Sequence, residues 1–227
     1  MQQSTLSRGV TLACVLAAAL ALSACSQRPY IPVADETLEP AAKGNFDFVF
    51  VAEGERIPRF DTVFVEPAEV TLSEYWLREH RGDYTDRDLE RIHREYARLL
   101  EEALKEGLMK QTGVTVTGNR EEADLVLAPR LRDLNIYGPD LSVPGITRHY
   151  TQDAGNATFD LVLRTPEGEA LAQFVDHREA DGLMTNRLEW TSRATNYRHF
   201  RQLMEHWTRN LTQYLLIGGA VPSAEAP

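Results

Sequence analysis

Two long apolar stripes with the period of an α-helix constrain the fold more than any other feature of the 227 residues. The first lies between Thr85, which offers an N-cap hydroxyl, and Gly113, where the pattern stops. Its apolar members are Leu89, Ile92, Tyr96, Leu99, Leu100, Ala103, Leu104 and Leu108. The second, within 195–216, comprises Phe200, Leu203, Met204, Trp207, Leu211, Tyr214 and Leu215. Each stripe predicts a helix that buries one face, and we expect Trp207 in the core rather than in a ligand site.

Stretches of β-branched and apolar residues predict strands before and between the helices. Residues 61–70 read as one buried strand in which Pro67 marks a bulge or an edge, and a short strand over 46–52 precedes it. VTVTG and ADLVLAPRLRDLNIY also read as strands, with Pro129 and the polar residues that follow it making a bulge or an edge. Residues 156–164 alternate apolar and polar side chains and turn through TPEGE into a returning strand. The order predicts an α+β fold, a mixed, largely antiparallel sheet with two long helices packed on one face.

The N-terminus carries an apolar block, residues 10–22, that is too short to span a membrane, because a spanning helix needs about 20 apolar residues. Arg8 precedes the block and small residues end it, as in a secretory signal. The sequence LSAC, ending at Cys25, resembles the bacterial lipobox, which implies cleavage before that cysteine and acylation of its thiol. The alternative is an ordinary secretory signal cut after Ala24, with Cys25 uninvolved.

The use of cysteine supports lipidation. Of the two cysteines, Cys14 lies inside the segment to be removed, so the mature chain would keep only Cys25 and could form no internal disulfide. Each buried methylene contributes about 0.8 kcal/mol to membrane binding, so two or three acyl chains anchor a protein stably. Ser26 follows the cysteine. In lipoproteins with this motif an aspartate there commonly means retention in the inner membrane, so Ser26 predicts the outer membrane, with the protein facing the periplasm.

The rest of the chain reads as one domain with two loose ends. We expect a lipoprotein signal peptide over 1–24, a lipidated N-terminus and flexible tether over 25–45, a single α+β periplasmic domain over 46–217, and a flexible tail over 218–227. The formal net charge is −10. A chain this acidic repels nucleic acid, so no nucleic-acid partner is expected.

Three sets of residues carry a resemblance to a known family. They are Phe60, Asp61, Val65, Pro67 and Val70; Gly155, Ala157, Leu163, Arg164, Gly168, Glu169, Leu171, Ala172, Val175 and Asp176; and Trp207 with Leu211. They resemble the aromatic-Asp…V-x-P-x-x-V opening, the G-x-A…L-R-D…G-E-x-L-A…V-D hairpin and the closing tryptophan helix of bacterial lipoproteins in domain-of-unknown-function family 3313. Where that family has an acidic turn residue after the arginine, this chain has Thr165-Pro166. The resemblance covers about 60–216 and implies topology and envelope location, but no catalytic residue.

No pattern in the sequence predicts a catalytic, metal or cofactor site. None of the six histidines lies in H-x-x-x-H or H-E-x-x-H, so no metal is expected. Asp176 and His177 would form half of a catalytic triad, but the G-x-S-x-G turn that presents a serine nucleophile is missing. Residues 137–155 form the longest stretch without periodicity, which is either a partner-binding or gating loop or a simple connector.

These patterns favour a non-enzymatic cell-envelope lipoprotein, an accessory or partner-binding subunit tethered to the outer membrane. The expected partners are the membrane, through acyl chains on Cys25, and an envelope protein; no cofactor and no small-molecule ligand is expected. The alternative is an envelope hydrolase whose active site these motifs do not reveal.

Overall fold

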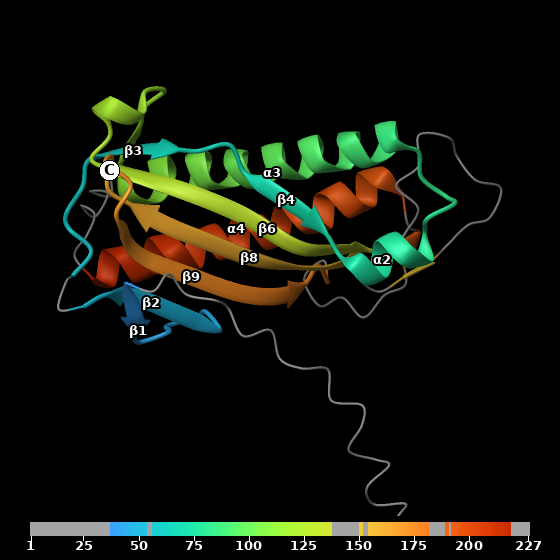
Figure 1. Cartoon of the computed structure of the whole chain (residues 1–227), viewed down its shortest axis with the longest axis horizontal. Helices are drawn as coiled ribbons and strands as arrows, with labels where there is room; N and C mark the ends of the chain where they lie inside the picture. The colour runs from blue at the N-terminus through green and yellow to red at the C-terminus, as the bar shows by residue number, and fades with distance from the viewer. Residues whose placement is uncertain are drawn as a thin grey trace, which may run out of the picture. The chain divides into compact units, whose positions relative to one another are not determined.

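The protein folds as an eight-stranded sheet with two long helices on one face, which confirms the predicted α+β class (Figure 1). The structure is a computed structural model. It describes residues 37–53, 56–137, 150–151, 154–181, 189–190 and 192–218. In chain order the elements are β1 (Leu38–Pro40), β2 (Phe48–Ala52), β3 (Thr62–Val65), β4 (Glu69–Leu72), α2 (Glu74–Glu79), α3 (Asp86–Thr112), β5 (Thr115–Val116), η1 (Arg120–Glu122), β6 (Leu125–Ile136), β7 (Tyr150–Thr151), β8 (Gly155–Arg164), β9 (Ala170–Glu179), β10 (Glu189–Trp190) and α4 (Arg193–Ile217).

The sheet is mixed and mainly antiparallel, as predicted. Its strand order is β1-β2-β9-β8-β6-β3-β5, and β4 pairs with β6 farther along the same edge as β3. The pairs from β1 to β6 are antiparallel, whereas β3 and β4 run parallel to β6, and β5 runs parallel to β3. β8 and β9 form the predicted hairpin. β7 and β10 form a separate two-stranded ladder.

Both long helices begin and end at residues suited to that position. The hydroxyl of Thr85 accepts a hydrogen bond from the backbone N–H of Asp88, whose carboxylate accepts one from the Thr85 backbone N–H, so α3 starts with a capping box. Gly113, with φ of 71°, ends α3 in the left-handed conformation that glycine adopts without strain. Ser192 caps α4, which is slightly longer at both ends than the predicted 195–216.

The core lies between the helices and the face of the sheet turned towards them. Trp207 of α4 is fully buried, as expected, and its ring stacks on Phe159 of β8 with 5.3 Å between the ring centres. Ala157, Leu161 and Leu163 lie on the same face of β8 as Phe159, because side chains two residues apart share one face of a strand. The opposite side chains of β8 point away from the helices.

The prediction of one strand over 61–70 is wrong. The chain breaks around Pro67 into β3 and β4, each of which pairs with β6. Pro129 itself lies inside the central strand β6 and not at an edge, whereas the predicted bulge occurs among the polar residues that follow it. The carbonyl of Leu127 accepts the N–H of Glu66, so the backbone of Leu127 faces β3. The backbone of Pro129, two residues later, points to the same side and faces the gap between β3 and β4. No described strand pairs with it there, so the missing N–H of proline costs no hydrogen bond of the sheet.

The bulge in β6 lies four residues later. At Asp133 the backbone has φ of 51°, and the register with β8 shifts between Arg132 and Asn135. The backbone N–H of Asp133 donates a hydrogen bond of 3.4 Å to the hydroxyl of Thr71 in β4.

The folded part begins earlier than the predicted boundary at residue 46. Leu38–Pro40 pairs with β2 as β1, and Leu38 is buried, so this part of the expected tether over 25–45 belongs to the sheet. Three residues are too few to show a periodic pattern, and this is why the sequence did not indicate the strand. The expected signal peptide, the acylated cysteine and residues 219–227 of the expected tail lie outside the described residues. Within the described residues, no helix is both long and apolar enough to cross a membrane.

Candidate functional site: the outer face of the sheet

The two faces of the sheet have different surroundings. The helices α3 and α4 pack on one face; among the described elements, no helix packs on the other, which we call the outer face (Figure 1). Residues paired across neighbouring strands share a face, so the pairing register gives the membership of this surface. On the outer face lie Phe48, Phe50, Glu69, Ala128, Arg130, Arg132, Thr158, Asp160, Val162, Arg164, Gln173, Val175 and His177.

A buried carboxylate lies at the centre of the outer face. Asp160 of β8 is fully buried, and Arg130 lies directly opposite it on β6. One carboxylate oxygen of Asp160 accepts Nη2 of Arg130 at 3.1 Å and Nε2 of Gln173 at 2.8 Å. Its other oxygen lies 2.9 Å from Nε of Arg132. A buried charge is tolerated only when it is paired, and here two arginines pair with Asp160, one of whose oxygens also accepts two hydrogen bonds.

The two arginines carry more positive charge than Asp160 neutralises. The side chains of Arg130 and Arg132 are 27% and 33% exposed, and both pair with the same carboxylate. A guanidinium has five N–H donors, so Arg130 keeps donors that its bond to Asp160 does not use. The centre of the outer face is therefore a partly exposed cluster of two arginines on one buried carboxylate.

Two aromatic rings border this cluster. Phe48 and Phe50 of β2 lie opposite Val175 and Gln173 of β9 on the same face. Their rings stack with 6.4 Å between centres, and Phe48 is 38% exposed. Phe48, which is exposed, and Phe50, which is half-buried, lie on the same face as the arginines, and both residue types are enriched at protein-binding surfaces.

Asp176 and His177 point to opposite faces of the sheet. The carboxylate of Asp176 is buried towards the helices, where it accepts Nε1 of Trp207 at 2.9 Å and pairs with Arg178. His177 lies on the outer face, with Nδ1 2.9 Å from the hydroxyl of Thr158. Consecutive strand residues always diverge in this way, so the two side chains do not form an acid–base pair. Burial raises the pKa of Asp176, and its bonds to Arg178 and Trp207 oppose that rise.

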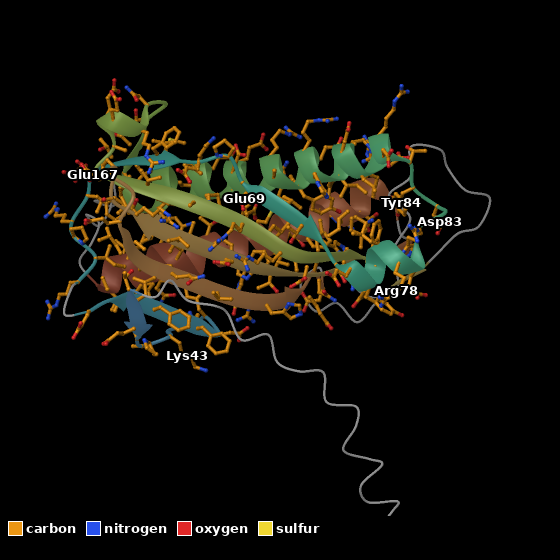
Figure 2. All side chains as sticks on the ribbon, viewed as in Figure 1. Lys43, Glu69, Arg78, Asp83, Tyr84 and Glu167 are labelled. Carbon is orange, nitrogen blue, oxygen red and sulfur yellow. The ribbon has the colours of Figure 1, made fainter. Side chains whose placement is uncertain are left out.

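The outer face is hollowed where β3 gives way to β4. A pocket of about 340 Å³ opens there. It is lined by Glu66, Pro67, Glu69, Arg120, Ala128, Pro129, Arg130, Val162, Arg164 and Gly168. Figure 2 shows Glu69 on β4, beside this break. The pocket exists because Pro67 interrupts the strand, so the sheet lacks one stretch of backbone at this point.

Most of the site residues expected from the sequence lie outside the part of the chain that the structure describes. Cys25 and Ser26 lie outside the described residues, as do 138–149 and 152–153 of the unpatterned stretch 137–155. Among the residues that the structure describes, no group of three or more histidine, cysteine or acidic side chains is placed to hold a metal ion.

The sequence did not single out the cluster around Asp160. Two signals were visible: Arg130 and Arg132 recur at the spacing of one strand face, and an aspartate lies between Phe159 and Leu161 in an apolar strand. What the sequence could not show is that these side chains meet, because their contact depends on the register between β6 and β8.

Comparison with known proteins gives loose structural likenesses only. No family model matches the chain, and no curated protein matches it. The fold is similar to that of a neuraminyllactose-binding hemagglutinin homologue from Helicobacter pylori, with a TM-score of 0.39 and 12% identity over 72% of this chain and 90% of that chain. It is also similar to PelC from Paraburkholderia phytofirmans, crystallised as a dodecamer, with a TM-score of 0.34 and 13% identity over 72% of this chain and 96% of that chain.

A DUF4136 family protein from Bacteroides thetaiotaomicron is similar at a TM-score of 0.36 and 11% identity, over 80% of this chain and 98% of that chain. At these TM-scores the likeness carries no information on function, so the function proposed below is argued from this chain's own residues. The resemblance to family 3313 stays a prediction.

Proposed function

We propose that the protein is a non-enzymatic cell-envelope lipoprotein that binds a protein partner through the outer face of its sheet. Acyl chains on Cys25 would tether it to the membrane, and Ser26 would sort it to the outer membrane, with the folded part in the periplasm. The LSAC motif at the end of a short apolar block supports the anchor, because that block is too short to span.

The observation that carries the binding role is the cluster of Asp160, Arg130 and Arg132 beside the aromatic pair Phe48 and Phe50. The ion pairs and the strand register hold the arginines in place, so little side-chain entropy is lost when a partner binds. Arginine and aromatic side chains are also the residues that contribute most binding energy at protein interfaces. A pre-arranged surface of this composition favours a partner-binding subunit.

Site-specific photo-cross-linking in living cells tests this role. A photoreactive amino acid is placed at Phe48 or at His177 on the outer face, and in the control at Arg98, whose side chain is 65% exposed on α3. We expect irradiation to give a discrete cross-linked product from both outer-face positions and none from Arg98. No product from the outer face, or the same products from all three positions, would contradict a partner-binding outer face.

A further inference from the structure

We propose that the pocket at the β3–β4 break binds a carboxylate group of the protein partner. The inference rests on the proposed function and adds the chemistry of the contact: an aspartate, glutamate or C-terminal carboxylate of the partner enters the pocket and is held by arginine. The pocket, of about 340 Å³, is large enough to admit such a side chain.

Three arginines from three separate elements line this pocket: Arg120 from η1, Arg130 from β6 and Arg164 from β8. Arginine binds carboxylates through two parallel N–H···O bonds and keeps its charge at any physiological pH. Arginines so far apart in sequence meet here only because β6 lies between the break and β8. Their convergence on one hollow is the geometry of an anion-binding site.

The arginines differ in how far their charge is already neutralised. Arg120 pairs with Glu66, and its Nε donates to the carbonyl of Pro166 at 3.1 Å. Arg130 shares Asp160 with Arg132. Arg164 donates Nη1 to the carbonyl of Gly168 at 3.0 Å and forms no ion pair among the described residues. Among the three arginines of the pocket, Arg164 is therefore the one whose charge no described carboxylate neutralises.

Glu69 is the opposing charge. It also lines the pocket and forms no ion pair within the described part of the chain. Its carboxylate would repel an anionic ligand and would attract a cationic one. Removing this charge therefore distinguishes the two kinds of ligand, because it should strengthen anion binding and weaken cation binding. The pocket's remaining acid, Glu66, is occupied by Arg120. The lining of the pocket thus holds three arginines and two acids, in a chain whose net charge is −10.

The test uses the purified full chain in detergent and a fluorescein-labelled hexaglutamate peptide, with binding followed by fluorescence anisotropy at low salt. Hexaglutamine with the same label is the neutral control peptide. We expect hexaglutamate to bind and hexaglutamine not to bind. Arg164→Gln should weaken hexaglutamate binding about tenfold, as the loss of a charged hydrogen bond predicts. Glu69→Gln should strengthen it several-fold, and Arg94→Gln, which removes an exposed charge from α3, should leave it within twofold.

Equal weakening by Arg164→Gln and Arg94→Gln would overturn the inference, because the effect would then be one of net charge alone. Weakening by Glu69→Gln would also overturn it, since the pocket would then favour a cationic group. If outer-face cross-links form but the Arg164→Gln substitution leaves peptide binding unchanged, only the pocket assignment fails. If hexaglutamate binds as expected but no outer-face cross-link forms, the partner-binding function fails and the anion site stands.

Discussion

Asp160 and Asp176 are fully buried carboxylates on opposite faces of the sheet, and each is held by arginine. Asp160 organises the outer face, whereas Asp176 joins the sheet to α4 through Nε1 of Trp207. Removing one partner of a buried charge leaves the other without compensation, and this costs more than the intact pair contributes. Asp160 therefore holds side chains of the outer face in place, and Asp176 holds α4 against the sheet.

Trp207→Ala should lower the free energy of unfolding by about 3–5 kcal/mol, because it leaves a cavity against Phe159 and removes the donor to Asp176. Trp207→Phe keeps most of the ring but not the donor, so we expect a smaller loss, about 1–3 kcal/mol. Chemical denaturation followed by circular dichroism measures both. A normal unfolding curve for Trp207→Ala would mean that this helix face packs against something other than the protein's own core.

Asp124 predicts a pH dependence of stability. Its Oδ2 accepts the hydroxyl of Thr62 at 2.8 Å and the backbone N–H groups of Thr62 and Asp61, and these bonds lower its pKa below 3.8. A lowered pKa contributes stability that is present above 3.8 and is lost as pH falls through the folded-state pKa. Asp124→Asn should therefore lower the free energy of unfolding at pH 7, by less than about 1 kcal/mol in this exposed position, and the difference should vanish in acid.

The control for this experiment is Asp83→Asn, an exposed acid in the turn between α2 and α3 (Figure 2). It removes the same charge without removing bonds to β3. Equal pH profiles for the Asp124 and Asp83 variants would show that Asp124 acts only through net charge.

At the scale of elements, the sequence predicted the parts whose pattern is local. The stripe and caps of α3 lie within one continuous stretch, so its bounds could be predicted almost to the residue. The division of residues 61–70 at Pro67 was missed because β3 and β4 both pair with β6, a partner that no local pattern reveals. The salt bridges of Asp160 were missed for the same reason: their members come from β6 and β8, and register brings them together.

The contact between α3 and α4 depends on Gly107. A Cβ at this position would lie 2.3 Å from Cγ2 of Thr208, which is buried in α4. Gly107→Ala should therefore destabilise the protein by about 1–3 kcal/mol through overpacking, although alanine favours a helix by about 1 kcal/mol over glycine. Denaturant unfolding measures the change.

Thr208→Ala supplies the matched background, because it removes the methyl group that the new Cβ would meet. In that background Gly107→Ala should be neutral or stabilising, since only the helix preference remains. If Gly107→Ala stabilises the protein with Thr208 present, the two helices do not pack as closely as described.

At the scale of the whole molecule, charge is distributed unevenly. The chain is acidic overall, yet the outer face carries Arg130, Arg132 and Arg164, and the first two pair with the buried Asp160. A negative net charge keeps a protein from anionic lipid surfaces, so the proposed attachment to the membrane depends on acyl chains rather than on basic residues. The role proposed for these arginines is instead to bind an acidic group of a protein partner.

The intact mass of the protein extracted from membranes tests the central claim most directly, because in this account the attachment to the membrane depends on one residue, Cys25. The account predicts a chain that begins at Cys25, lacks residues 1–24 and carries the mass of its acyl chains, and it predicts that Cys25→Ala releases the protein from the membrane fraction. A mature chain with an unmodified Cys25 thiol, or a Cys25→Ala variant that still fractionates with membranes, would contradict it.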